Sequence, residues 1–221
     1  MTPAAPVLLF DLDGTLIDSA PDLAGAANDL RAAHGLAPLP HEVLRPMVGS
    51  GARGMVGVAF GVLPGDERFA DLRDAFLARY AERLLRSTQV FAAVQPVLDA
   101  LDAAGLRWGI VTNKAMRFTG PLVAGLGLAQ RAAVVIAGDT TPYAKPHPAP
   151  LLEAARRINV APETCTYIGD DHRDILAGQA AGMATLAAGW GYLGQGESVH
   201  AWGADRVLSS PGELLHWLEL A

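Results

Sequence analysis

Two carboxylates, Asp11 and Asp13, stand two residues apart at the end of a short apolar run that covers residues 7–10. A run of Val, Leu and Phe of this length is typical of a buried strand. Unpaired carboxylates are costly inside a core, so their position after the strand favours a chemical role. They could bind a hard cation and present one carboxylate as a nucleophile. The alternative is a strand that simply ends in two solvated acids.

Three further apolar runs also end in polar residues. In a parallel sheet the strands are buried on both faces and read as continuous apolar runs. Ligands bind in the crevice beyond the carboxyl ends of such strands. We therefore expect one site to receive the polar residues of all the runs, which are 108–111 followed by Thr112, Asn113 and Lys114; 134–136 followed by Lys145; and 166–168 followed by Asp170, Asp171 and Asp174.

The elements that must position these residues alternate along the second half of the chain. Apolar periodicity and glycine stops predict helices at 94–104, 117–126, 148–158, 173–181 and 211–220, and strands at 106–112, 133–137, 166–169, 184–187 and 206–208. Alternation of this kind indicates βα units and a parallel sheet, so the fold class is α/β with a doubly wound, Rossmann-like parallel sheet.

The segment between the first strand and residue 90 has a different, helical pattern. Apolar spacing predicts long helices at 20–33, with Ser19 as its N-cap, and at 66–85, with shorter pieces at 42–48 and 52–60. This predicts a core formed by residues 1–17 and 90–221 and an inserted α-helical cap formed by 18–89. The alternative is that these helices pack directly on the sheet.

Composition excludes several classes of protein. The chain has 221 residues and 51% hydrophobic content, enough for a sizeable core, and a single cysteine, Cys165, which favours a buried structural thiol over a disulfide. The net charge of −6 argues against a nucleic-acid partner, and no apolar run is long enough to span a membrane. No signal peptide is visible, so we expect a cytoplasmic monomer or homodimer that acts on a small molecule.

Four motifs, in order, resemble those of the haloacid dehalogenase (HAD) superfamily of phosphotransferases. They are Asp11-Leu12-Asp13-Gly14-Thr15-Leu16, the hydroxyl of Thr112, Lys145 before Pro146, and Gly169-Asp170 with Asp174. The resemblance spans nearly the whole chain and includes a small helical cap after the first strand. It implies a Mg²⁺-dependent phosphatase that works through an aspartyl phosphate.

The resemblance also implies a role for each site residue. Asp11 would be the nucleophile and Asp13 the general acid and base. Mg²⁺ would be held by Asp11, the backbone carbonyl of Asp13 and Asp170. Thr112 would donate its hydroxyl to a phosphate oxygen, as would the backbone N–H groups of Leu12 and Asn113. Lys145 would neutralise the nucleophile and the phosphoryl group, and Asp174 would orient Lys145 or a metal-bound water. The motif fixes no role for Asp171.

The motifs fix no role for two further residues, Arg53 and His172. Arg53 lies in a glycine-rich stretch of the predicted cap and is either the cap's contact to a substrate anion or an exposed helix-start arginine. His172 lies in the same loop as Asp171, and we expect it to be solvated.

Two branches of the superfamily compete for the substrate. Residues 10–23 and 145–148 resemble phosphoglycolate phosphatase, whereas residues 51–56, 108–114, 169–175 and 202–205 resemble N-acetylmuramic acid 6-phosphate phosphatase. We lean slightly to the muramic sugar phosphate. A phosphomutase or dehalogenase of the same fold and a phospho-receiver signalling module remain alternatives, although a dehalogenase would not need Asp13 or Asp170.

Overall fold

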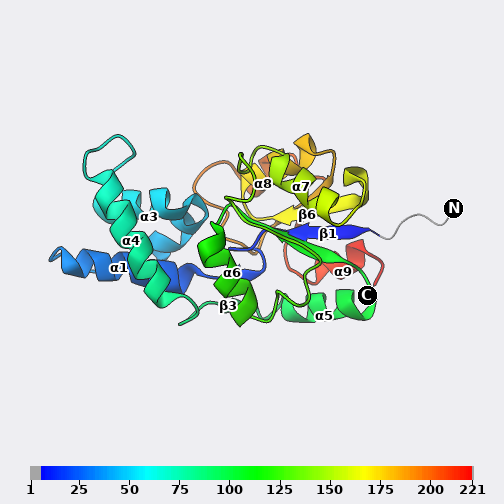
Figure 1. Cartoon of the computed structure of the whole chain (residues 1–221), viewed down its shortest axis with the longest axis horizontal. Helices are drawn as coiled ribbons and strands as arrows, with labels where there is room; N and C mark the ends of the chain where they lie inside the picture. The colour runs from blue at the N-terminus through cyan, green and yellow to red at the C-terminus, as the bar shows by residue number, and fades with distance from the viewer. Residues whose placement is uncertain (1–5, 221) are drawn as a thin grey trace.

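Six parallel strands form the central sheet of the computed structural model, which describes residues 6–220 (Figure 1). Their order across the sheet is β5-β4-β1-β6-β7-β8, so the chain winds outward on one side of β1 and then crosses to the other side. The strands are β1 Val7–Phe10, β4 Trp108–Val111, β5 Val135–Ile136, β6 Cys165–Gly169, β7 Ala184–Ala188 and β8 Arg206–Leu208. This order confirms the doubly wound α/β prediction.

Alternate residues of β1 enter different hydrophobic cores. Leu8 and Phe10 join a cluster with residues of α5 (Gln95–Ala103), α6 (Met116–Gly125) and α9 (Glu213–Trp217). Val7 and Leu9 join a second cluster with residues of α7 (Ala149–Arg157) and α8 (His172–Ala180). Because helices cover both faces, a continuous apolar strand has no solvent face. Cys165 is buried in the second cluster as a free thiol, as the sequence predicts.

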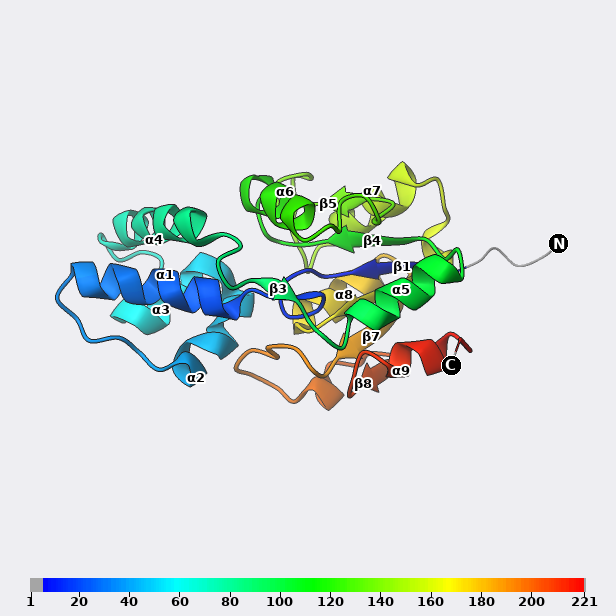
Figure 2. The ribbon, with the colours of Figure 1, turned by 90° about the horizontal axis from the view of Figure 1, so that it is seen from below.

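The helices that follow β1 pack around a core of their own. They are α1 Ala20–Ala33, α2 His41–Leu44, the 3₁₀ helix η1 Arg45–Ser50, α3 Gly51–Phe60 and α4 Phe69–Arg83. Their shared cluster includes Leu30, Met55 and Phe76, and it meets the rest of the chain at Phe118 and Tyr192. Figure 2 shows this helical insertion at one end of the molecule and the sheet at the other. The boundaries of the cap stay a prediction.

A short antiparallel pair that the sequence did not indicate joins the two connections of the insertion. Ile17–Asp18 (β2) pairs with Gln89–Val90 (β3), so the chain leaves and re-enters the core side by side. Two-residue strands carry no periodicity to detect. Ser19 is the N-cap residue of α1, as the sequence predicts, but its hydroxyl donates to Asp13 and makes no capping hydrogen bond to the helix.

The last helix is shorter than the predicted 211–220. It covers Glu213–Trp217, and the left-handed φ of 56° at Glu219 breaks the helical path near the chain end. No helix among the described residues combines the length and apolar character needed to cross a bilayer.

Asp22 ties α1 to the returning segment of the insertion and generates a stability prediction. Its fully buried carboxylate accepts hydrogen bonds from the backbone N–H groups of Ser87 and Thr88 and from the Thr88 hydroxyl, at 2.7–3.1 Å. Asp22→Ala leaves the donors of the buried Thr88 without acceptors, so we expect the free energy of unfolding to fall by about 2–3 kcal/mol in urea denaturation. The exposed Asp71→Ala on α4 is the control and should change it by less than about 0.5 kcal/mol. Equal effects of the two variants would contradict this role.

Candidate active site

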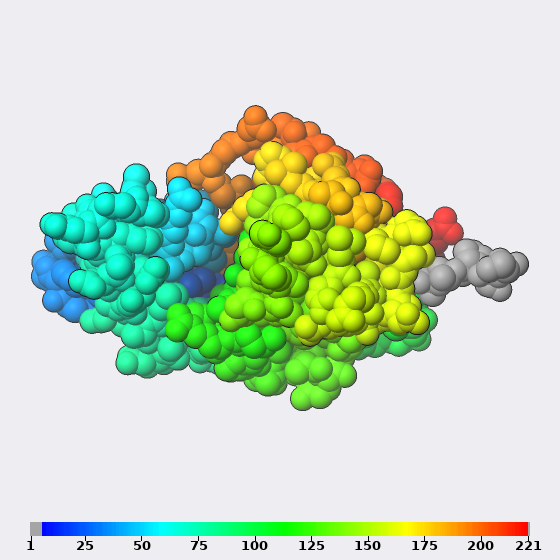
Figure 3. All heavy atoms as spheres, turned by 45° about the horizontal axis from the view of Figure 1, so that its top comes forward, coloured from blue at the N-terminus to red at the C-terminus, as the bar shows by residue number. Residues whose placement is uncertain are grey.

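A cavity of about 440 Å³ lies between the carboxyl ends of the strands and the helical insertion. Figure 3 shows the surface hollowed where the insertion meets the core. The sheet edge supplies polar side chains, and the insertion supplies a mostly apolar wall. The polar residues predicted from the strand ends meet here as expected, since the cavity is lined by Asp11, Asp13, Thr112, Asn113, Lys145, Asp170, Asp171 and Asp174.

Lys145 lies at the centre of the charged cluster. Its Nζ is 2.9 Å from Asp11 Oδ1 and 2.7 Å from Asp174 Oδ1, with only 2% of the side chain exposed. Burial alone would lower the pKa of Lys145, but the two carboxylates raise it above the usual value, so the ammonium stays charged. Lys145 thus contacts two carboxylates, one that directly follows β1 and one on α8.

A tyrosine that sequence reasoning missed lies beneath this lysine. The Tyr167 hydroxyl accepts a hydrogen bond from Lys145 Nζ at 2.7 Å and donates to the Val111 carbonyl at 2.7 Å. Tyr167 therefore links β6, β4 and the Lys145 loop below the cavity. The sequence did offer one indication of this contact. A tyrosine in an otherwise apolar buried strand needs a hydrogen-bond partner for its hydroxyl.

Three carboxylates form a cluster that could hold a metal ion. Ligand atoms of Asp11, Asp170 and Asp174 lie within 4.8 Å of one another. Asp170 is oriented by the Thr15 hydroxyl at 2.8 Å and the Tyr192 backbone N–H at 2.8 Å. Asp11 Oδ1 is buried and, despite the Lys145 ion pair, lacks a partner with hydrogen-bond geometry. An all-oxygen set of carboxylates suits a hard cation such as Mg²⁺.

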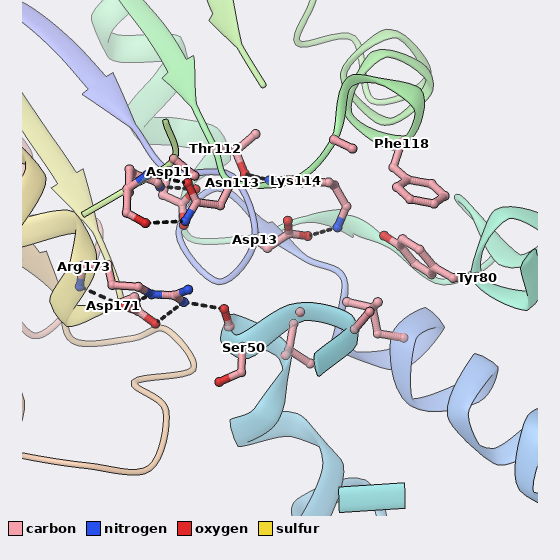
Figure 4. Close-up of a pocket in the computed structure, with 18 of the residues that line it drawn as sticks. Asp11, Asp13, Ser50, Tyr80, Thr112, Asn113, Lys114, Phe118, Asp171 and Arg173 are labelled. Carbon is pink, nitrogen blue, oxygen red and sulfur yellow. Dashed lines mark hydrogen bonds and ion pairs between the residues drawn. The ribbon is translucent and has the colours of Figure 1, made fainter. Parts of the chain in front are cut away.

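The carboxylate of Asp13 lies outside that acidic cluster. Its Oδ1 accepts hydrogen bonds from the Ser19 hydroxyl and from Lys114 Nζ, the latter at 2.7 Å (Figure 4). Asp13 is therefore held by Ser19, the residue before α1, and by the loop after β4. Lys114 follows its strand as the sequence indicates, but sequence reasoning gave it no role.

Asn113 positions the loop that carries Lys145. Its side-chain amide donates to the Lys145 carbonyl and accepts from the Lys145 backbone N–H, both at 2.9 Å. Gly138 makes room for this loop, because a Cβ at that position would lie 2.1 Å from the Asn113 carbonyl oxygen. Thr112 is buried and lines the cavity, whereas the Leu12 side chain belongs to the core, which leaves only its backbone to face a ligand.

Asp171 serves as the N-cap of α8. Its side chain accepts from the Arg173 backbone N–H, and Asp174 completes a capping box. Asp171 also pairs at 2.7 Å with the guanidinium of Arg173, which donates to the Gly49 carbonyl of the insertion at 2.5 Å. The sequence gave no hint that Arg173 connects the core to the insertion.

The structure also places Arg53, for which the sequence left two alternatives, and His172. Arg53 is exposed on α3 and lines a neighbouring hollow with Arg173 and Gln195, not the cavity that contains Asp11. The helical turn directs Gly54, Met55 and Val56 inward and leaves Arg53 on the outer face. His172 is half-buried, and its ring stacks against that of Trp202 with 6.1 Å between the ring centroids, so its side chain is partly solvated.

The acidic cluster predicts an unusual pH dependence of stability. Burial raises the pKa of Asp174 to about 7, helped by Asp11 and opposed by Lys145. An unfolded aspartate has a pKa of about 4, so between pH 4 and 7 the folded chain keeps a proton that the unfolded chain releases. In the presence of a chelator, the free energy of unfolding should therefore fall as the pH rises through this window.

Asp174→Asn is the control for this titration, because an amide does not ionise. The free energy of unfolding, measured with denaturant at each pH, should fall less between pH 4 and 7 for Asp174→Asn than for the unmodified chain. A fall of equal size in both proteins would show that Asp174 does not cause the pH dependence.

Comparisons with known proteins agree with this geometry. The family model described as haloacid dehalogenase-like hydrolase matches residues 8–188. A phosphoglycolate phosphatase of Xanthomonas campestris is 46% identical over 94% of this chain and 93% of its own length. An N-acetylmuramic acid 6-phosphate phosphatase of Pseudomonas aeruginosa is 40% identical over 97% and 95%.

Solved structures share the whole architecture. The crystal structure of a predicted phosphoglycolate phosphatase from Haemophilus somnus superimposes with a TM-score of 0.85 at 25% identity and covers 98% of this chain and 99% of its own. CbbY of Rhodobacter sphaeroides, solved in complex with phosphate, gives a TM-score of 0.76 at 24% identity, covers 98% of this chain and 100% of its own, and supports the fold alone. With the family model, the relatives and the strand-end carboxylates in agreement, this chain belongs to the haloacid dehalogenase-like hydrolase family.

Proposed function

We propose that this chain is a Mg²⁺-dependent phosphomonoesterase that works through a phosphoryl group carried on Asp11. The observation that carries the proposal is the Asp11 carboxylate itself. It stands at the end of β1 and within the acidic cluster, and its buried Oδ1 lies 2.9 Å from the Lys145 ammonium. A nucleophile for phosphorus needs such an oxygen and nearby positive charge.

The surrounding residues supply the other requirements of phosphoryl transfer. Asp11 would attack phosphorus and release the alcohol, while Asp13 donates a proton to the leaving oxygen. Asp13 would then take a proton from the water that cleaves the aspartyl phosphate, which returns Asp11 to its carboxylate form. Thr112 and Lys145 would donate hydrogen bonds to the phosphoryl oxygens.

Asp11, Asp170 and the backbone carbonyl of Asp13 would hold Mg²⁺, with Asp174 orienting Lys145. Bound there, the ion would neutralise charge on the phosphoryl oxygens. The support for this assignment is the set of carboxylate oxygens within 4.8 Å, of which Asp174 is also a member.

We propose a small phosphate ester that also carries a carboxylate as the substrate, either N-acetylmuramic acid 6-phosphate or 2-phosphoglycolate. The support is that relatives named for both activities match nearly the whole chain at similar identity. A cytoplasmic location and a monomeric or dimeric state remain predictions.

The first experiment replaces the nucleophile. Asp11→Asn retains the size of the side chain, but an amide cannot form the acyl phosphate, so phosphate release from an aryl phosphate in Mg²⁺ should become undetectable. Circular dichroism should show an unchanged fold, and a chelator should abolish activity of the unmodified chain. More than a few per cent of activity in clean Asp11→Asn protein would contradict the proposal, as would full activity after exhaustive chelation.

A second experiment tests Asp13 through the leaving group. Asp13→Ala should slow single-turnover cleavage of an alkyl phosphate by about 10²–10⁴-fold, the usual contribution of a general acid. A nitrophenyl phosphate has a good leaving group and should lose much less in the same step. Equal losses on both esters would mean that Asp13 supports the structure of the site rather than protonating the leaving oxygen.

A further inference from the structure

Tyr80 of α4 brings a buried hydroxyl without a partner to the cavity. The residue is 1% exposed and lines the cavity, and its oxygen has no hydrogen-bond partner among the residues that the structure describes. Leaving a buried hydroxyl unpaired is costly, so the position calls for an explanation. In Figure 4 the hydroxyl end of Tyr80 points toward Lys114 and Asp13.

Lys114 approaches the same place from the sheet edge. Its Nζ lies 4.9 Å from the centre of the Tyr80 ring and 2.7 Å from Asp13 Oδ1. An ammonium has three N–H donors, and within residues 6–220 only Asp13 accepts a hydrogen bond from this one. The lysine therefore has donors to spare.

Both groups are donors in the states that their surroundings favour. Burial raises the pKa of Tyr80 to about 12, so its hydroxyl keeps its proton. Burial would lower the pKa of Lys114, but the Asp13 carboxylate raises it above its usual value, so its ammonium stays charged. A neutral donor and a charged donor beside one another match the oxygens of an anion.

The remaining wall beside this pair is apolar. Phe118 lies 5.3 Å from the Tyr80 ring, and Phe76 stacks on the other side at 6.5 Å. With Leu23 and Leu77 they line the cavity next to the two donors. These apolar side chains can pack against the carbon atoms of a ligand.

We propose that Tyr80 and Lys114 form a subsite that binds the carboxylate of the phosphate ester, so that these two residues, and not Arg53, determine specificity. The proposal rests on the proposed phosphatase function for the presence of such an ester. Arg53 lies outside the cavity, and Arg117 lies at its rim as an exposed side chain. Lys114 also contacts Asp13, so the bound carboxylate lies close to the proposed proton donor.

Two matched pairs of esters test the subsite. The first pair is 2-phosphoglycolate with 2-hydroxyethyl phosphate, and the second is N-acetylmuramic acid 6-phosphate with N-acetylglucosamine 6-phosphate. Members of a pair differ by the carboxylate-bearing group. Calorimetric dissociation constants would be measured with Mg²⁺ in the Asp11→Asn background, which is expected to bind esters without consuming them.

We expect Asp11→Asn protein to prefer the carboxylate member of at least one pair, and the pair that shows this preference identifies the source of the carboxylate. Adding Tyr80→Phe should reduce that preference roughly tenfold, the effect of losing one hydrogen bond to a charged group. Adding Lys114→Met should reduce it at least as much. The exposed Tyr143→Phe and the rim variant Arg117→Met are controls and should retain the preference.

A structural role for Tyr80 predicts a different result. Because its hydroxyl has no partner, Tyr80→Phe should leave the free energy of unfolding unchanged or higher, while the carboxylate preference falls. An unchanged preference in both Tyr80→Phe and Lys114→Met would overturn the proposal, as would a loss in Arg117→Met alone or no preference within either pair.

Phosphate release by the unmodified chain keeps the two proposals apart. Tyr80-dependent carboxylate binding without phosphate release from any of the four esters would uphold the subsite and contradict the phosphatase function. Phosphate release with no effect of Tyr80 or Lys114 on the preference would do the reverse.

Discussion

The contact between one buried ammonium and the carboxylates around it is the interaction on which the site depends. Lys145 meets Asp11 and Asp174 within 3 Å, and Asp170 completes an acidic group whose ligand atoms all lie within 4.8 Å. Like charges this close and this buried repel strongly unless a cation neutralises them. Burial raises the pKa of Asp170 and Asp174, and the neighbouring carboxylates raise it further.

The fold is arranged so that this charged cluster can form. Because β1 lies between β4 and β6 in a parallel sheet, their carboxyl ends meet at one edge. Tyr167 and Asn113 then fix the Lys145 loop through its ammonium and its backbone. Helices cover both faces of the sheet. This packing holds the charged side chains at the sheet edge close together, where solvated side chains would move apart.

The helical insertion adds what the sheet edge lacks. In the proposed function, the strand-end cluster would bind the phosphoryl group that every phosphate ester shares, and the insertion would provide a surface for the rest of the molecule. It is tied to the site at Ser19, whose hydroxyl reaches Asp13, and at Gly49, whose carbonyl meets Arg173. Movement of the insertion would therefore change the hydrogen bond between Ser19 and Asp13, the proposed proton donor.

Much of this arrangement follows from the sequence, for a physical reason. Apolar runs that end in polar residues identify both the strands and their functional ends, so Asp11, Lys145 and Asp170 could be placed together. Tyr167, Tyr80 and Lys114 could not be assigned roles, because their roles come from neighbours distant in the chain. The position of Arg53 could not be predicted for the same reason, because the face of α3 that carries it depends on how the helix packs.

The most direct test of the account is to find the phosphoryl group on the protein. Asp13→Asn protein should form the aspartyl phosphate from an aryl ester but lack the base that helps water remove it. Rapid acid quenching, proteolysis and mass spectrometry should then find one added phosphoryl group on the peptide that contains Asp11, and none when Asp11→Asn is combined with it. Turnover with no phosphorylated peptide, or a phosphoryl group on another residue, would contradict the account.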